Sequence, residues 1–273
     1  MYFLIVTLVK DNYAEFWKTR TSILNQTHKA THLIIDSSEN SVNLPLVNPE
    51  PNLIYLVTQP SSIYEAMNDA LDFIKDRIIQ DPYVLFLNSG DELSSRTVLE
   101  RLTQFIARGE GWFYTSYMVK DPLTNVAALI RPFSSTLRNQ LYIKRPIHHQ
   151  ALFVRASILA LNGHFNTGFK VGADWDYICR LRLRNEGQFI DIVSTNFELG
   201  GYSSINRKQG NKELFFLRRK YLKQTIFERT ISLVFFLYRE FRLKVYFSLL
   251  NENPRMLKLA RLITGWREAD NNN

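Results

Sequence analysis

Residues 63–93 read IYEAMNDALDFIKDRIIQDPYVLFLNSGDEL, a stretch that predicts a helix, a buried strand and an acidic turn. Apolar residues recur at helical spacing in its first half, and Ser62 with Glu65 matches a capping box at the start of the helix. Residues 83–87 are apolar and β-prone, as expected of a strand that is covered on both faces. The strand ends in residues 88–92, NSGDE, where no core residue remains.

Outward from this stretch, strands and helices alternate along the chain. Before it, the sequence predicts strands at 2–9, 32–35 and 53–57, a helix at 13–26 and a loop at 40–52. After it, the less regular second half predicts strands at 112–119, 126–130, 148–154 and 189–193, and helices at 156–161 and 174–185. The β-α-β-β-α-β order of the first half predicts an α/β fold, in which helices flank both faces of a mostly parallel sheet.

The acidic turn after the strand at 83–87 is a candidate binding site. Ligands of open α/β sheets bind at the carboxyl ends of the strands. Asp91 would present a carboxylate there, beside Gly90, which lets a backbone approach closely. These residues suit a metal and phosphate site, but the same residue types also form ordinary strand-ending turns. Taken alone, the segment leaves both interpretations open.

Several classes of protein are excluded or disfavoured by what the sequence contains. The single cysteine, Cys179, excludes an internal disulfide framework and a cysteine zinc site. The histidine pair 148–149 has no cysteine nearby and no further histidine spaced for a metal, so we do not predict a zinc site. A P-loop, a G-x-G-x-x-G and a G-x-S-x-G motif are missing, which disfavours ATPase, dinucleotide-binding and serine-hydrolase functions. No apolar run reaches the ~18 residues of a transmembrane helix, and the first strand does not resemble a signal peptide.

The charge divides the chain into two parts. Residues 207–267 contain 15 Lys and Arg against 4 Glu, a net charge of +11, whereas the whole chain carries +8 and the remainder therefore −3. We predict an α/β domain at 1–206 and a basic, aromatic-rich helical segment at 207–273. The segment is typical of amphipathic helices on an anionic membrane surface. A pair of helices packed on the α/β domain with a charged outer face is the alternative, and a nucleic-acid function has charge alone in its favour.

Five segments, in this order, resemble the family 2 glycosyltransferases, and most of all the bacterial branch that builds exopolysaccharide and lipopolysaccharide. They are residues 2–12, 22–38, 63–71, 85–93 and 148–187, and the resemblance spans residues 2–203. It implies a GT-A fold and an inverting transfer of a sugar from a nucleotide-diphosphate donor to an acceptor hydroxyl. That chemistry needs a cation at the leaving diphosphate, a base for the acceptor proton and a pocket for the nucleotide.

The resemblance assigns the metal site to the turn after the strand at 83–87. Asp91 resembles the last acid of the family's DxD-type motif, the direct ligand of Mn²⁺ or Mg²⁺. Asn88 and Gly90 stand where the family more often has acids, and we expect both to line the nucleotide-sugar site. A single protein carboxylate suffices in this interpretation, because Mg²⁺ often keeps waters and takes substrate phosphates as ligands.

The resemblance assigns the general base to Asp174, which would take the proton from the attacking hydroxyl. Asp174 also stands at the start of a predicted helix, where a carboxylate can cap backbone amides instead. Asp176 is the rival base. Because residues two apart on a helix point to different faces, we expect only one of the two to face the site.

The remaining assignments follow from the same resemblance. Thr7, Asp36, Tyr64 and Asn68 would line the nucleotide-sugar pocket, although a Ser/Asp turn explains residues 36–38 equally simply. His149, Gly201, Ser203 and Asp176 are weaker candidates for contact with the acceptor or the diphosphate, the glycines as part of a closing loop. Tyr64 and Asn68 are expected on the helix face opposite the apolar stripe.

The resemblance implies a metal-dependent inverting glycosyltransferase that acts on a lipid-linked glycan at the cytoplasmic face of a bacterial membrane. The composition of residues 207–267 predicts peripheral membrane contact through that segment. Two other classes stay open. One is an inactive relative that binds the sugar nucleotide without transfer. The other is a membrane-surface scaffold that acts through the basic segment and does not need Asp91.

Overall fold

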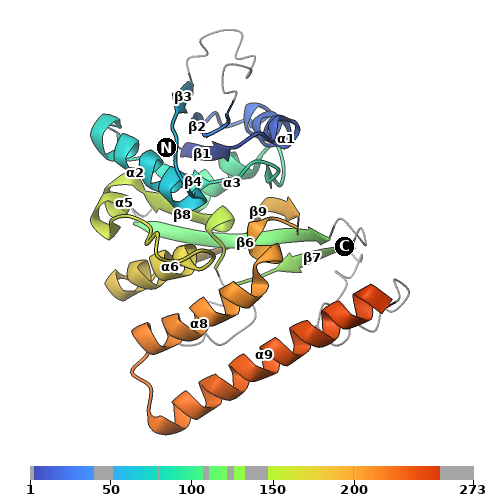
Figure 1. The fold of residues 1–273 in the computed structure, drawn as a ribbon. Coiled ribbons are helices and arrows are strands. Elements are labelled where there is room, and N and C mark those ends of the chain that lie inside the picture. Colours follow the sequence, from blue (N-terminus) through green and yellow to red (C-terminus); the bar gives the residue numbers. More distant parts are fainter. Residues whose placement is uncertain are drawn as a thin grey trace.

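The computed structural model describes residues 3–39, 52–78, 80–106, 111–121, 126–132, 147–198 and 200–252. These ranges form one curled sheet of nine strands in the order β3-β2-β1-β4-β8-β6-β9-β5, with β7 paired to β6 (Figure 1). The strands are β1 Phe3–Val9, β2 Thr31–Asp36, β3 Leu53–Val57, β4 Tyr83–Phe86, β5 Glu92–Leu93, β6 Trp112–Asp121, β7 Val126–Ile130, β8 Leu152–Arg155 and β9 Gln188–Glu198.

Strands β3, β2, β1 and β4 run parallel, as do β6 and β9, whereas β5, β7 and β8 pair antiparallel. The helices are α1 Tyr13–Leu24, α2 Ile63–Arg77, α3 Val98–Phe105, α5 Ala156–Asn162, α6 Ala173–Arg184, α7 Tyr202–Ile205, α8 Arg207–Tyr221 and α9 Ile226–Glu252. The predicted α/β class, with a mostly parallel sheet between helices, is confirmed.

Two apolar cores lie on opposite faces of the sheet, and β1 contributes to both. Leu4 and Val6 point into a core shared with α2, α5, α6 and α8, whereas Phe3 and Ile5 point into a core shared with α1 and α3. This alternation follows from the two-residue period of a strand. The first face therefore brings α6 and α8, from the second half of the chain, against the same sheet as α2.

The capping box at α2 forms only in part. The Ser62 hydroxyl accepts the Glu65 backbone N–H at 3.3 Å, as predicted. The Glu65 carboxylate instead accepts the backbone N–H of Ser61 at 2.7 Å and the hydroxyl of the same residue at 2.6 Å. The serine that precedes the N-cap offers two donors where Ser62 would offer one, which explains the departure.

The predicted strand at 148–154 is wrong in its first half. Residues His149–Ala151 form a 3₁₀ turn, closed by a hydrogen bond from Ala151 N–H to the His148 carbonyl at 3.0 Å, and β8 begins only at Leu152. Because of this turn, the neighbouring side chains of His149 and Gln150 point to different carboxylates, Asp174 and Asp91. The predicted loop at 40–52 lies, except for its last residue, outside the described residues.

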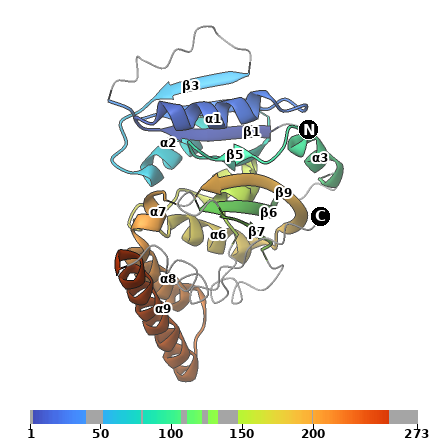
Figure 2. The same ribbon diagram turned by 90° about the vertical axis from the view of Figure 1, so that its right-hand side faces the viewer.

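The C-terminal helices lie at one end of the molecule, below the sheet in Figures 1 and 2. Leu214 and Leu217 of α8 are buried in the same core as α2 and α6. Helix α9 packs on α8, with the rings of Phe215 and Phe236 5.4 Å apart. Residues 207–221 therefore share a core with the α/β domain, and the boundary after residue 206 stays a prediction. Among the described helices, none has the length and apolar character needed to cross a membrane.

Candidate active site

The turn that follows β4 is held in place by α1. The Thr19 hydroxyl accepts the Gly90 N–H at 2.9 Å and donates to the Asp91 carbonyl at 2.7 Å. The Ser89 hydroxyl donates to the Leu8 carbonyl at 2.8 Å. Gly90 has a φ of +97°, a backbone conformation that side chains strongly disfavour, and a Cβ there would lie 3.1 Å from the Glu15 carboxylate. The turn is thus fixed on both sides.

Asp91 is a buried carboxylate with little compensation for its charge. Burial raises the pKa of Asp91 to about 7, although a hydrogen bond from Gln150 and the nearby His149 act in the opposite direction. The Gln150 amide donates to Asp91 Oδ2 at 3.2 Å. Nearby, the side-chain oxygen of Asn88 is buried and has no hydrogen-bond partner among the described residues. The turn therefore holds two oxygen ligands that lack a strong partner.

His149 connects this turn to α6. Its Nδ1 lies 3.0 Å from Asp174 Oδ2, and its Nε2 lies 3.2 Å from the Asn88 side-chain nitrogen. Because a carboxylate accepts, Nδ1 donates to Asp174, while Nε2 faces the Asn88 amide. His149 thus bridges the turn of β4 and the start of α6, and its contact with the diphosphate or the acceptor stays a prediction.

His148 fixes the orientation of Gln150. Burial and the neighbouring His149 lower the pKa of His148 to about 4, so the ring is neutral near pH 7. Its Nδ1 is hydrogen-bonded to the Gln150 side-chain oxygen, which turns the amide nitrogen of Gln150 toward Asp91. One short turn therefore places Gln150 on Asp91 and His149 on Asp174.

Asp174 lies in the first turn of α6 and is buried. Its Oδ1 accepts the Trp175 backbone N–H at 2.8 Å, while Oδ2 faces His149. The carboxylate keeps further lone pairs for a substrate proton. Asp174 thus binds a backbone amide at the start of α6 through Oδ1, and its role as the general base stays a prediction.

The loop before α6 is held by α8 and α2. The buried Glu213 carboxylate accepts the backbone N–H groups of Lys170, Val171 and Gly172, at 2.9, 2.9 and 2.7 Å. The Tyr64 hydroxyl donates to the Val171 carbonyl at 2.5 Å. These contacts come from two helices and set the position at which α6 starts.

Tyr64 and Asn68 do not lie opposite the apolar stripe of α2, contrary to the sequence prediction. Tyr64 is buried in the core, and Asn68 forms two hydrogen bonds with the backbone of Phe165, at 2.8 and 3.0 Å. The loop before α6 covers this side of α2, which the helical period alone does not reveal. Both residues support the loop, and their contact with a nucleotide sugar stays a prediction.

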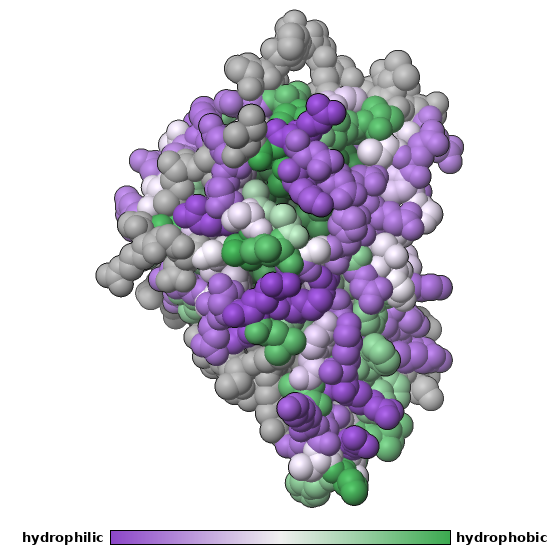
Figure 3. Space-filling model, turned by 90° about the vertical axis from the view of Figure 1, so that its left-hand side faces the viewer, coloured by the Kyte–Doolittle hydropathy of each residue, from purple (hydrophilic) through white to green (hydrophobic). Residues whose placement is uncertain are grey.

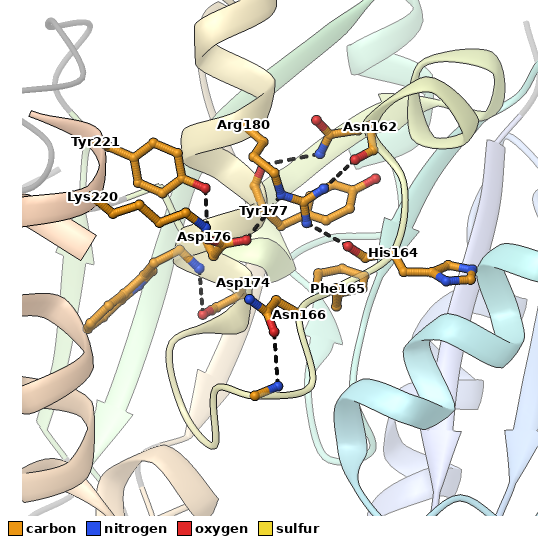
Figure 4. A network of polar contacts seen from close by, with 12 residues as sticks. Asn162, His164, Phe165, Asn166, Asp174, Asp176, Tyr177, Arg180, Lys220 and Tyr221 are labelled. Atoms are coloured by element: carbon orange, nitrogen blue, oxygen red, sulfur yellow. Dashed lines mark hydrogen bonds and ion pairs between the residues drawn. The ribbon is translucent and has the colours of Figure 1, made fainter. Parts of the chain in front are cut away.

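Asp176 points into a separate polar network (Figure 4). Its carboxylate accepts from Lys220 and Tyr221 of α8, each at 2.7 Å, and from Arg180 at 3.1 Å. Arg180 in turn donates to the carbonyls of Asn162 and His164. Asp176 thus ties α6 to α8, and which of the two aspartates acts as the base stays a prediction.

Thr7 is not placed to line a pocket in this structure. Its side chain is buried in the middle of β1, and its hydroxyl lies 2.9 Å from Nε2 of the buried His32. Asp36, the last residue of β2, accepts from the Tyr55 hydroxyl at 2.5 Å and from the Ser38 N–H at 2.9 Å. Asp36 therefore stands at the strand end as predicted, but with its two oxygens already bonded within the protein.

Gly201 and Ser203 lie at the start of α7 and are exposed. They follow Gly200, whose φ of +121° allows the chain to turn after β9. A Cβ at Gly201 would meet no atom within 4 Å. The predicted role of this segment as a closing loop is compatible with its openness and stays a prediction.

Sequence reasoning missed Thr19, Gln150 and Glu213. Thr19 and Glu213 carry no motif, since they act on backbone groups far away in the sequence. Gln150 directly follows His149 in the segment that carries the resemblance, and this position next to a candidate residue is the signal that could have indicated it.

The donor set at Asp91 fits a hard divalent cation that shares its coordination with a substrate. No group of three or more His, Cys, Asp or Glu side chains suited to a metal occurs in the part of the chain that the structure describes. The under-compensated Asp91 carboxylate and the unpartnered oxygen of Asn88 are both ligands that Mg²⁺ and Mn²⁺ accept, with waters and phosphate oxygens completing the shell.

No protein-family model matches this chain. An uncharacterized glycosyltransferase of Mycobacterium tuberculosis is 25% identical over 209 residues, which are 73% of this chain and 76% of the relative. A PGL/p-HBAD biosynthesis glycosyltransferase of Mycobacterium bovis is 28% identical over 173 residues, 62% of this chain and 64% of the relative.

Solved structures with the same fold include two glycosyltransferases. Residues 1–349 of Staphylococcus aureus TarS in complex with UDP-GlcNAc match with a TM-score of 0.62 and 16% identity, over 97% of this chain and 80% of that one. The mannosyltransferase PcManGT of Pyrobaculum calidifontis, in complex with GDP-Man and Mn²⁺, matches with a TM-score of 0.57 and 12% identity, over 97% and 81%. From its sequence relatives and its fold, the chain is a glycosyltransferase with a GT-A-like architecture.

Proposed function

We propose that this chain, as a family 2 glycosyltransferase, moves a sugar from a nucleotide-diphosphate donor to a hydroxyl of a glycan acceptor, with inversion at the anomeric carbon. The observation that carries the proposal is the turn at His149 and Gln150, which joins Asp91 to Asp174. Crystal complexes of TarS with UDP-GlcNAc and of PcManGT with GDP-Man support a nucleotide sugar as the donor.

Asp174 acts as the general base. Its carboxylate accepts the proton of the acceptor hydroxyl while that oxygen forms a bond to the anomeric carbon, on the face opposite the diphosphate. The bond between the anomeric carbon and the diphosphate breaks, and its electron pair leaves with the diphosphate. The N–H of His149 holds Asp174 Oδ2 in place during this step. A positioned base of this kind contributes about 10²–10⁴-fold to the rate.

Asp91 and the side-chain oxygen of Asn88 would hold a Mn²⁺ or Mg²⁺ ion together with the donor diphosphate. The bound ion would offset the negative charge that grows on the diphosphate. Its presence would also compensate the buried charge of Asp91. The complex of PcManGT with Mn²⁺ supports this assignment.

The acceptor is a growing, lipid-linked glycan in the synthesis of a bacterial surface polysaccharide, and the enzyme works at the cytoplasmic face of the membrane. The resemblance to the exopolysaccharide and lipopolysaccharide branch supports this choice, as does the net charge of +11 in residues 207–267. An anionic leaflet attracts such a segment.

Thermal stabilisation by UDP, GDP, dTDP and CDP, each with and without Mn²⁺, tests the donor site. We expect a metal-dependent rise in Tm with one nucleotide and no rise in Asp91→Ala. A shift in both proteins would contradict the role of Asp91. Transfer kinetics then test the base: Asp174→Asn should lower kcat at nearly unchanged Tm, whereas Asp176→Asn should lower Tm. Nucleotide binding without transfer or hydrolysis would identify an inactive relative.

A further inference from the structure

Besides Phe235 and Tyr238, six exposed apolar side chains in the described part of α9 lie on one side of the helix. They are Ile226, Phe227, Leu233, Val234, Leu237 and Phe241, with 45–83% of each side chain exposed. Their spacings of three, four and seven residues put them on one side of the helix, and we call this group the α9 strip. Single exposed apolar residues are common on proteins, but a contiguous strip marks an interaction site.

The other side of α9 is the one that packs on the molecule. Ser232 is buried, and Phe236 packs against Phe215 of α8. On an α-helix, residues 232 and 236 lie far around the axis from residues 227, 234 and 241. The α9 strip therefore faces away from α8. In Figures 1 and 2, α9 runs along the end of the molecule farthest from β3.

The C-terminal segment that carries the α9 strip is basic. Its exposed bases lie on α8 (Lys208, Lys212, Arg219 and Lys220), in the link between the two helices (Lys223) and in the first part of α9 (Arg229). Figure 3 shows hydrophobic side chains that reach the surface among hydrophilic ones at the lower end of the molecule, where α8 leads into α9. A basic segment with an exposed apolar helix face binds a lipid interface, with its apolar side chains among the acyl chains.

We propose that the α9 strip binds an anionic lipid surface. The charge favours a lipid over a second copy of the chain, because two copies would bring together two segments of +11 each, whereas an anionic leaflet offers the opposite charge. This inference concerns the surface of α9 and does not depend on the reaction proposed above. In that reaction, it would hold the enzyme at the membrane that carries a lipid-linked acceptor.

Vesicle flotation of the full chain tests the proposal. The test variant is Phe227→Glu, Val234→Glu and Leu237→Glu together, which puts three charges on the strip without touching the buried side of α9. Because each charge near an anionic leaflet changes the partition about fivefold, we expect its partition into phosphatidylglycerol-containing vesicles to fall by about a hundredfold. Wild-type protein should bind these vesicles, less so at high salt, and should not float with pure phosphatidylcholine.

The matched control is Phe105→Glu, Leu161→Glu and Leu183→Glu, which makes the same changes at apolar residues of α3, α5 and α6 that are 51–62% exposed. It should float as wild type does. Equal flotation of the strip variant and wild type would overturn the proposal, as would a wild-type protein that ignores anionic vesicles. A dimer in solution that only the strip variant abolishes, without flotation of wild type, would assign the strip to a second copy instead.

A nucleotide-induced rise in Tm, measured on the same samples, separates this proposal from the proposed function. Lost flotation with a retained shift would support the lipid surface alone. A missing shift in wild type, with normal flotation, would leave the lipid surface standing and remove the donor site.

Discussion

At the scale of single residues, two neighbours in the 3₁₀ turn, His149 and Gln150, each form a hydrogen bond with one of the two carboxylates of the candidate site. Gln150 holds the buried Asp91, and His149 holds Asp174. His148 holds Gln150 in place, because its neutral ring is hydrogen-bonded to the Gln150 side chain. Misplacement by a fraction of an ångström at such residues costs activity, because catalysis depends on the orientation of the reacting groups.

Asp91→Asn is expected to raise the Tm of the metal-free protein at about pH 8 and to change it little at about pH 4. Burial raises the pKa of Asp91 from 3.8 to about 7, so the folded state holds this proton more tightly than the unfolded state does. The protonated Asp91 carboxyl therefore adds to the free energy of unfolding below about pH 4, and this contribution is lost as the pH rises to about 7. Asparagine removes that loss, which is on the order of a few kcal/mol at most.

A pH series of Tm values for wild type and variant measures the effect, and the difference cancels other titrating groups. The exposed Asp72 provides the control, since Asp72→Asn should bring no gain at about pH 8. Parallel curves for Asp91→Asn and wild type would contradict the buried, under-compensated state of Asp91. Mn²⁺ should stabilise wild type and leave Asp91→Asn unchanged.

His149→Ala is expected to lower kcat about 10–100-fold. The reason is that Asp174 loses the N–H donor that orients it, and the Asn88 amide loses its contact with the ring. His149→Asn should recover part of the rate, because its amide can supply an N–H. His164 also pairs with an aspartate, Asp72, but on the surface, and His164→Ala should keep the full rate. If His149→Ala lowered the rate by unfolding the protein, its Tm would fall as well. Thermal unfolding therefore distinguishes a loss of orientation at Asp174 from a loss of folded protein.

At the scale of elements, α6 is positioned by α8. Glu213 binds the backbone just before α6, and Lys220 and Tyr221 bind Asp176 within its first turn. The sequence predicted a helix at 174–185 and a basic helical segment at 207–273, which includes α8. It did not predict this contact, because a carboxylate that caps a distant loop leaves no pattern in its own helix.

Glu213→Gln is expected to destabilise the protein by about 1–3 kcal/mol and to lower kcat. The amide keeps one acceptor oxygen but brings an N–H group against backbone N–H donors of residues 170–172. Urea unfolding and transfer kinetics measure the two effects. Glu65 also accepts a backbone N–H but is only half-buried, so Glu65→Gln should change both far less. A stable Glu213→Gln protein with normal kcat would show that α8 does not position Asp174.

At the scale of the whole molecule, the C-terminal helices divide between two tasks. Helix α8 completes the core that also holds α2 and α6, and α9 carries the exposed strip. The change in composition at residue 207 marks a change in surface charge, whereas the packing continues to residue 221. The charge pattern of a helix indicates which residues face solvent, but it does not show what the buried side of the same helix contacts.

Truncation should reveal this division. A chain that ends at residue 221 is expected to fold with a Tm near that of wild type and to lose vesicle binding. A chain that ends at residue 206 is expected to lose cooperative unfolding, because it lacks Leu214, Leu217 and the Glu213 carboxylate that caps the loop before α6. Thermal unfolding and flotation of both chains measure the outcome. An intact Tm for the shorter chain would make 1–206 an independent domain.

The sequence by itself determined the α/β class, most of the strands and helices, and the turn that presents Asp91. These features depend on local periodicity and turn chemistry, which neighbouring residues carry. The tertiary structure alone decided that Gln150 meets Asp91, that His149 bridges Asn88 and Asp174, and that Thr7 points inward to His32. Each of these contacts joins residues at least 25 positions apart, and only the packing of the sheet and its helices selects such partners.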